Sequence, residues 1–108
     1  MPIFIQTGKM SEQFVHELSE DPENRFKAVS DVMAAAGATL KEYYFTTGET
    51  DWLMIIEADD LDAVAAASLV ALGANGAASV STCQAWTAAE FKAVAAKAGE
   101  IASKYRQP

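Results

Sequence analysis

Residues 46–60, TTGETDWLMIIEADD, decide how the chain folds. A polar turn containing Gly48 leads into the apolar segment WLMIIEA (52–58), which ends at two aspartates. The preceding segment, residues 39–47, is rich in aromatic and β-branched residues. Both compositions are typical of strands, and a link as short as TGETD joins neighbouring antiparallel strands. The stretch therefore predicts a β-hairpin.

Strand and helix patterns alternate through the rest of the chain. Apolar runs bounded by glycine predict strands, and apolar residues at helical spacing behind a capping residue predict helices. The capping box at Thr87 and Glu90 marks the start of the last helix. The predicted segments are a strand at 3–7 ending at Gly8, a short helix after Ser11, a helix from Asp21-Pro22 to Gly37, a helix from Asp59 or Asp60 to about Leu72, a strand at 78–86, and a helix at about 87–106.

The order of the main elements is β-α-β-β-α-β, followed by a C-terminal helix. This order predicts an α+β, ferredoxin-like fold, in which two split βαβ units share one antiparallel sheet. A chain of 108 residues is expected to form a single domain, residues 1–108.

Both faces of the predicted sheet are apolar. Helices would cover one face, but residues 52–56 (WLMII) offer no polar alternation for the other. An apolar face of this kind needs a second cover, and we expect a second copy of the chain, in a two-fold homodimer through the sheet face. The alternative is that the C-terminal helix folds back over that face.

Charge and composition narrow the range of partners. The chain carries 15 Asp and Glu residues against 8 Lys and Arg residues, a formal net charge of −7. Because this charge repels a phosphate backbone, we expect no nucleic-acid partner. No apolar run is long enough to cross a bilayer and the N-terminus lacks a signal-peptide pattern, so we expect no membrane partner and a cytoplasmic location. A single cysteine fits a reducing compartment.

Four segments of the sequence resemble the GYD-domain family, small ferredoxin-like proteins of the dimeric α/β-barrel type. The segments are MPIFIQTGKMS (1–11), EYYFTTGETDWLMIIEADD (42–60), LVALGANGAAS (69–79) and STCQAWTAAEF (81–91). The resemblance extends to about Phe91 and implies the fold and dimerisation. The family has no settled biochemical activity, so the resemblance implies no substrate. The sequence departs from the family at Thr50, where the family has a tyrosine before the aspartate.

Two residues are candidates for catalysis. Asp51, at the start of the second hairpin strand, is either a base or ligand-binding carboxylate at the rim of a cleft, or a turn residue that accepts backbone amides; we favour the turn. His16, the only histidine, is either a general base, a haem ligand or a solvated side chain among the acids of HELSED; we favour the last. No second ligand stands at a suitable spacing, so we expect no metal and no cofactor.

Aromatic residues on three predicted strands are the candidate ligand-binding set: Tyr43, Tyr44, Trp52 and Trp86. These side chains can line a pocket for an apolar molecule, or can form core and dimer interface. Cys83 is expected to be a small buried side chain. Lys9 and Arg25 are the cations placed to meet an anionic ligand, with surface solvation as the default reading.

Our leading hypothesis is a small homodimer that binds a small, partly apolar molecule between its sheet and its helices. One alternative is a cofactor-independent monooxygenase or isomerase, which requires His16 or Asp51 to face that pocket. The other alternative is a purely structural interaction module, whose sheet face is used entirely by a partner chain.

Overall fold

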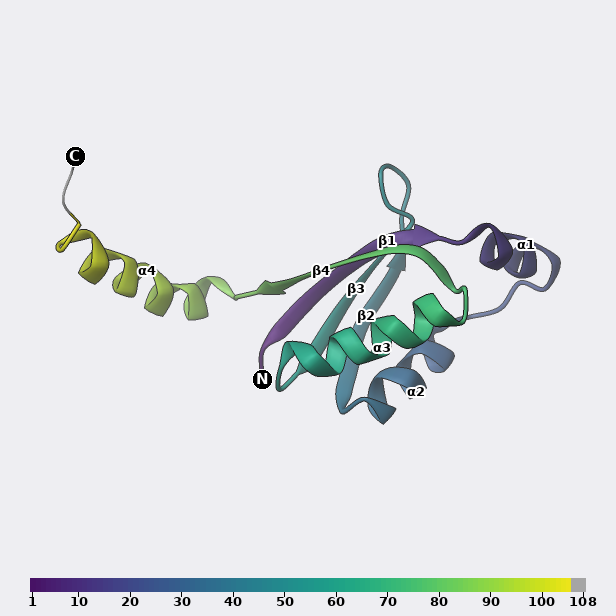
Figure 1. Cartoon of the computed structure of the whole chain (residues 1–108), viewed down its shortest axis with the longest axis horizontal. Helices are drawn as coiled ribbons and strands as arrows, with labels where there is room; N and C mark the ends of the chain where they lie inside the picture. The colour runs from purple at the N-terminus through teal and green to yellow at the C-terminus, as the bar shows by residue number, and fades with distance from the viewer. Residues whose placement is uncertain (106–108) are drawn as a thin grey trace.

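The computed structural model describes residues 1–105, which form four strands and four helices (Figure 1). In chain order the elements are β1 (Ile3–Met10), α1 (Glu12–Glu20), α2 (Phe26–Ala35), β2 (Ala38–Phe45), β3 (Trp52–Ala58), α3 (Leu61–Gly73), β4 (Ala77–Ala85) and α4 (Ala88–Ala102). The strands form one antiparallel sheet in the order β2-β3-β1-β4. This confirms the predicted ferredoxin-like fold. The predicted end of the last helix, at residue 106, lies outside the described residues.

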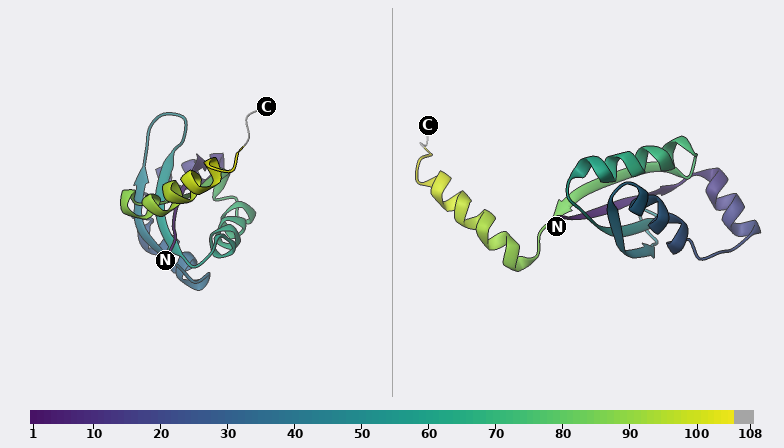
Figure 2. Two further views of the ribbon diagram at one scale, coloured as in Figure 1. Left: turned by 90° about the vertical axis from the view of Figure 1, so that its left-hand side faces the viewer. Right: turned by 90° about the horizontal axis from the view of Figure 1, so that it is seen from below.

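Helices α2 and α3 cover one face of the sheet (Figures 1 and 2). Side chains alternate between the two faces along each strand, and those on the helix-facing side are buried. Ile56 of β3 and Val64 of α3 are completely buried in this layer, where the two elements pack together. The apolar core consists of Phe4, Met33, Ala38, Leu40, Trp52, Met54, Ile56, Ala58, Val64, Ala67 and Ala77.

The opposite side of the sheet, which we call the open face, is apolar and uncovered by any helix of residues 1–105 (Figure 2). Its centre is formed by Ile3 and Ile5 of β1 and by Leu53 and Ile55 of β3. Ile5 lies opposite Ile55 in the register, whereas Ile3 lies opposite Glu57 and Leu53 opposite Thr7. Strand β3 is therefore apolar on both sides, as its sequence predicted. The alternative that α4 folds back over this face is wrong for the single chain.

Helix α2 begins at Phe26, not at Asp21 as the Asp-Pro pair predicted. Asp21 instead ends α1, because its backbone amide donates a hydrogen bond to the carbonyl oxygen of Glu17, at 2.9 Å. The side chain of Asn24 then accepts a hydrogen bond from the amide of Phe26, also at 2.9 Å, and so marks the start of α2. Residues 21–25 are a connection between two helices.

An irregularity in β2 decides which of its aromatic residues face the helices. The pairing of β2 with β3 shifts by one residue between Leu40 and Glu42, so Lys41 has no partner in the register. Tyr43 consequently pairs with Met54 on the helix-facing side. Tyr44 pairs with Leu53 and lies on the open face.

Helix α4 projects from the end of β4, away from the sheet and from the other helices (Figure 1). Every residue from 86 to 105 is exposed. The described chain measures 59 × 30 × 23 Å, with a radius of gyration of 17.3 Å, whereas a compact domain of this length has about 13 Å. The predicted capping box is present: the hydroxyl of Thr87 accepts from the amide of Glu90 at 3.0 Å, and the Glu90 carboxylate accepts from the amide of Thr87 at 2.8 Å.

A close approach between β1 and its neighbours requires glycine at position 8. A side-chain carbon on Gly8 would overlap the indole ring of Trp52 and the backbone carbonyl oxygen of Ser79. The carbonyl is held in the β1–β4 ladder and the indole is buried, so neither group can move aside cheaply.

We predict that Gly8→Ala destabilises the protein by about 1–3 kcal/mol, because the added methyl group overpacks this contact. Urea denaturation followed by tryptophan fluorescence measures the change. Gly73→Ala is the matched control, because its side chain would enter open space at the end of α3, and it should leave stability unchanged or slightly raised. Equal midpoints for wild type and Gly8→Ala would show that the contact is not a constraint.

Candidate functional site

A cavity of about 200 Å³ lies between the helix-facing side of the sheet and helices α2 and α3. We call it the inner cavity. Most of its lining is apolar, which suits the body of an apolar ligand. The apolar lining includes Val29, Val32 and Met33 of α2, Ala67, Val70 and Ala71 of α3, and Trp52, Met54 and Val80 of the sheet.

Gln6 supplies a fixed polar group in the wall of the inner cavity. It is buried on β1, and its side-chain amide donates to the hydroxyl of Ser68 at 2.7 Å and to the hydroxyl of Thr82 at 3.1 Å. The hydroxyl of Ser68 in turn donates to the carbonyl oxygen of Val64 at 2.9 Å. This chain of hydrogen bonds joins β1, β4 and α3, and it holds the polar side of the cavity in one geometry.

Tyr43 brings a phenol to the inner cavity from β2. Its ring packs against Phe45, with the ring centroids 4.9 Å apart. Burial raises the pKa of the Tyr43 hydroxyl above its usual value, and the nearby Arg25 guanidinium opposes this only in part. The hydroxyl therefore remains protonated at neutral pH, and can both donate and accept a hydrogen bond.

Arg25 lies at the mouth of the inner cavity, immediately before α2. Its Nη1 atom lies 2.6 Å from the carboxylate of Glu23, and its guanidinium lies over the ring of Phe14, 5.3 Å from the centroid. Its Nε atom is buried and has no hydrogen-bond partner among residues 1–105. A buried donor without a partner is costly, so this atom favours a ligand that carries an acceptor.

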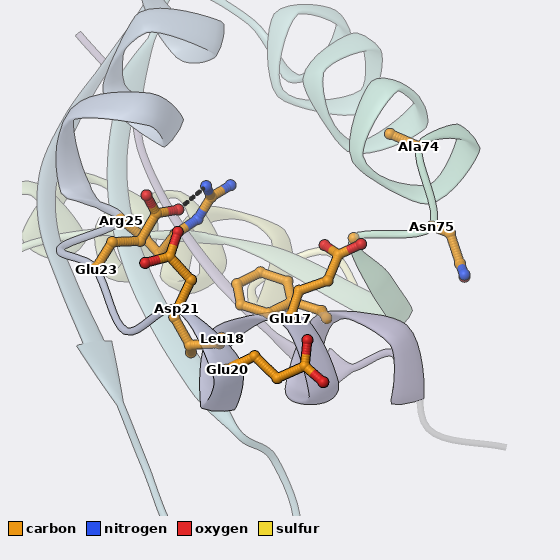
Figure 3. A pocket seen from close by; sticks show the side chains of 10 residues that line it. Glu17, Leu18, Glu20, Asp21, Glu23, Arg25, Ala74 and Asn75 are labelled. Atoms are coloured by element: carbon orange, nitrogen blue, oxygen red, sulfur yellow. Dashed lines mark hydrogen bonds and ion pairs between the residues drawn. The ribbon is translucent and has the colours of Figure 1, made fainter.

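A second hollow of about 480 Å³, the outer cleft, adjoins the inner cavity (Figure 3). The two share Phe14, Arg25, Ala74 and Gly76 in their linings. Figure 3 shows carboxylates from α1 and from the connection that follows it around the outer cleft, with Arg25 beside them. The acidic residues are Glu17, Glu20, Asp21 and Glu23. An apolar chamber thus opens beside a strongly polar one.

The structure brings together two of the four predicted ligand-binding aromatics, Tyr43 and Trp52. Tyr44 lies on the open face, 53% exposed, and its hydroxyl donates to Glu42 at 3.1 Å. Trp86 lies beyond the end of β4, exposed, with its ring 6.0 Å from that of Phe91. Neither Tyr44 nor Trp86 lines the inner cavity, so the predicted set of four does not form one site.

Asp51 ties the β2–β3 hairpin to the end of β1. Its carboxylate accepts a hydrogen bond from the amide of Met10 at 2.9 Å. Its own amide donates to the carbonyl oxygen of Gly8, and its carbonyl oxygen accepts from the amide of Thr46, both at 2.8 Å. The hydroxyl of Thr46 also donates to the carbonyl oxygen of Thr50, at 2.8 Å. Asp51 lies outside the lining of both hollows and has the geometry of a turn residue.

His16 lies on the outer side of α1, where its side chain is 78% exposed and 3.3 Å from the carboxylate of Glu20. Like the exposed Lys9, it lines neither hollow. Cys83 is exposed on the open face, so the expectation that it is buried is wrong. Within residues 1–105, no group of three or more His, Cys, Asp or Glu side chains is placed to hold a metal ion. In the same part of the chain, no helix has the length and the apolar character needed to cross a membrane.

Gln6 and Ser68 are the polar residues of the site that sequence patterns did not single out. A signal for Gln6 existed: it stands two residues after Phe4 in a strand, on the same face as an apolar side chain. Of the two cations named from the sequence, Arg25 lines the cavity and Lys9 does not. The position of Arg25 depends on the unpredicted start of α2 at Phe26.

A family profile described as GYD domain matches residues 4–95, which is most of the chain. The chain belongs to the GYD-domain family. This confirms the resemblance seen in the sequence, and the match ends within α4. Among curated proteins, none matches this GYD-domain protein in sequence.

Several solved structures are similar to the GYD-domain protein. The crystal structure of FFRP-DM1 is 18% identical, with a TM-score of 0.48, over 80% of this chain and 100% of that one. The crystal structure of TTHA0845 from Thermus thermophilus is 18% identical, with a TM-score of 0.49, over 82% of this chain and 96% of that one. An AsnC family transcriptional regulator from Agrobacterium tumefaciens is 20% identical, with a TM-score of 0.44, over 80% of this chain and 50% of that one.

We predict that Asp51→Ala lowers the free energy of unfolding by about 1–3 kcal/mol, because the amide of Met10 loses its partner at a half-buried position. Asp51→Asn should retain much of the stability, since its amide oxygen can still accept that hydrogen bond. Chemical denaturation of the three proteins measures the series. Glu49→Ala, in the same loop but exposed, should be neutral. An Asp51→Ala protein as stable as wild type would refute the anchoring role.

Proposed function

We propose that this GYD-domain protein is a small homodimer that binds a small, partly apolar molecule in the inner cavity. The observation that carries the proposal is the position of Arg25. Its buried Nε atom, which has no hydrogen-bond partner among residues 1–105, lies at the mouth of a largely apolar chamber. A chamber of this kind provides hydrophobic contact for the body of a ligand and one charged donor for its polar end.

The polar groups define the chemistry of that end. Arg25 Nε is a donor only, and the protonated Tyr43 hydroxyl can donate as well. Both favour a ligand with an acceptor oxygen, such as a carbonyl, a hydroxyl or a carboxylate group. The carboxylates of the outer cleft repel additional negative charge, so the ligand carries at most one anionic group.

The size of the inner cavity limits the ligand. About 200 Å³ lies below the roughly 300 Å³ at which pockets for drug-sized molecules begin. The ligand is therefore a small molecule that occupies the inner cavity with its apolar part, while any larger polar part extends into the outer cleft.

Binding without turnover is better supported than the monooxygenase or isomerase alternative. That alternative requires His16 or Asp51 to face the cavity, and neither side chain lines it. A general base must lie within hydrogen-bond reach of the proton that it removes. The Tyr43 hydroxyl, which stays protonated at neutral pH, is not a base there.

The homodimer is part of the proposal because the open face, centred on Ile3, Ile5, Leu53 and Ile55, needs a cover. A cytoplasmic location is also part of it. Cys83 is a free and exposed thiol on that face, which suits a reducing compartment. The interaction-module alternative shares the interface and differs in leaving the inner cavity empty.

A pair of adjacent tyrosines provides the test. Thermal-shift screening of the wild type with small carbonyl, hydroxyl and carboxylate compounds should find a stabilising ligand. Tyr43→Phe should weaken that ligand about fivefold, which corresponds to one hydrogen bond of ~1 kcal/mol. Tyr44→Phe is the matched control, because Tyr44 lies on the open face, and it should bind as wild type does. Calorimetric titration of the three proteins measures the affinities.

A second substitution tests the cavity itself. Ala71→Trp, from α3, should fill the chamber and abolish binding while the dimer persists. The proposal fails if no compound of these classes stabilises the protein, or if Tyr43→Phe and Ala71→Trp leave the affinity of a bound compound unchanged.

A further inference from the structure

Helix α4 carries an apolar seam that is exposed to solvent. The seam consists of Phe91, Val94, Ala98 and Ile101, which repeat at intervals of three and four residues. This spacing places the four side chains along one side of the helix, as in helices that pack against a partner. The ring of Phe91 meets that of Trp86 at a centroid distance of 6.0 Å, and Ile101 is 61% exposed. A seam of this kind in water indicates a missing contact surface.

The path of the chain carries α4 away from its own open face. Strand β4 ends at Ala85, and only Trp86 and the capping residue Thr87 separate it from α4. The reciprocal hydrogen bonds of the capping box fix the first turn of the helix immediately after the strand. Figure 1 and the right view of Figure 2 show α4 beyond the end of the sheet, so the same chain does not close the contact.

The open face matches the seam in shape. Its apolar centre is the side-chain row of two neighbouring strands, β1 and β3, which lie about 4.8 Å apart. One helix of about 10 Å diameter covers such a pair. The row from Ile3 to Thr7 is ~13 Å long at about 3.3 Å per residue. The seam from Phe91 to Ile101 is ~15 Å long at about 1.5 Å per residue.

Charge also favours a contact between α4 and the body of a second copy. Residues 1–87 contain 13 Asp and Glu residues against 4 Lys and Arg residues, a formal charge of −9. Residues 88–108 contain 2 against 4, a formal charge of +2. Two bodies packed sheet against sheet bring like charges together, whereas α4 brings Lys97, which flanks the seam, toward an acidic body that carries Glu42 and Glu57 on its open face.

We propose that two copies of the chain exchange their C-terminal helices, so that α4 of each copy packs with its seam on the open face of the other. The proposal rests on the homodimer proposed above and names the element that forms its interface. The exchange covers both uncovered apolar surfaces of each chain with one symmetric contact. Packing the two sheets directly against each other would leave both seams in water.

The native cysteine makes the contact measurable in the full-length protein. Cys83 stands on the open face, opposite Ile5 on β1. The double variant Cys83→Ser, Ala98→Cys has its single thiol on the seam of α4. Wild type, with a size tag, carries its thiol on the open face. When the two are mixed, exchanged and oxidised, we expect a disulfide-linked heterodimer on a non-reducing gel. Val94→Cys and Ile101→Cys, each in the Cys83→Ser background, extend the test along the seam.

A control variant distinguishes a disulfide formed in the specific α4 contact from one formed by random encounter of two chains. Ala96→Cys with Cys83→Ser places the thiol on the side of α4 away from the seam, and should give at least tenfold less heterodimer. Equal yields from the seam and control positions, or a Cys83–Cys83 dimer of wild type with no seam disulfide, would overturn the exchange and leave a sheet-to-sheet dimer.

Sedimentation provides a second measurement that does not depend on disulfide geometry. Ile101→Glu should raise the dimer dissociation constant at least tenfold, while Ala96→Glu should not change it. A dimer unaffected by Ile101→Glu would also overturn the exchange. A wild type that is a monomer at high concentration would overturn the homodimer as well. Ligand binding in the inner cavity is measured separately, by titration of wild type and Tyr43→Phe. Failure of the helix exchange therefore does not imply failure of the proposed ligand binding, and the reverse also holds.

Discussion

The indole of Trp52 lies against the backbone of Gly8, and the helix-facing side of the molecule is arranged around that contact. Only a residue without a side chain lets β1 pass this closely beneath a buried indole. Asp51, the neighbour of Trp52, then joins the hairpin to β1 through the amide of Met10. Trp52 is thereby fixed as part of the floor of the inner cavity, which α2 and α3 close from above.

Much of the fold could be predicted because its central strand carries an unambiguous pattern. The segment WLMIIEA has apolar residues on both faces, a composition typical of a buried strand. The caps at Ser11, Asp60 and Thr87 begin helices as expected. The orientation of α3 could not be predicted in the same way. Its sequence predicts a buried face formed by Leu61, Val64, Ala65, Leu69 and Leu72. Of these only Val64 is buried, together with Ala67, and the three leucines are exposed. This helix is apolar all round, so its periodicity does not distinguish the two sides.

The sequence predicted individual residues of the site but not how residues from different elements meet there. Trp52 was one of four strand aromatics expected to line a pocket or to form core and interface, and it does line the inner cavity. The partners that give the inner cavity its polarity come from elsewhere: Gln6 from β1 and Arg25 from the connection before α2. Their meeting depends on how the helices lie across the sheet, which local patterns do not encode. The exposure of Cys83 has the same origin, because it depends on what covers the open face.

The unpaired Lys41 in β2 has a consequence for comparing members of the family. Strand residues alternate between faces, so if Lys41 paired regularly, every later residue of β2 would point to the opposite side. A relative with the same number of residues but no bulge would offer its second tyrosine, rather than its first, to the chamber beneath the helices. A relative that lacks the bulged residue altogether would keep the first tyrosine there, because the pairing after Leu40 would continue unchanged. A gap of one position in an alignment of β2 thus marks the loss of the bulge and no change in what the chamber offers a ligand.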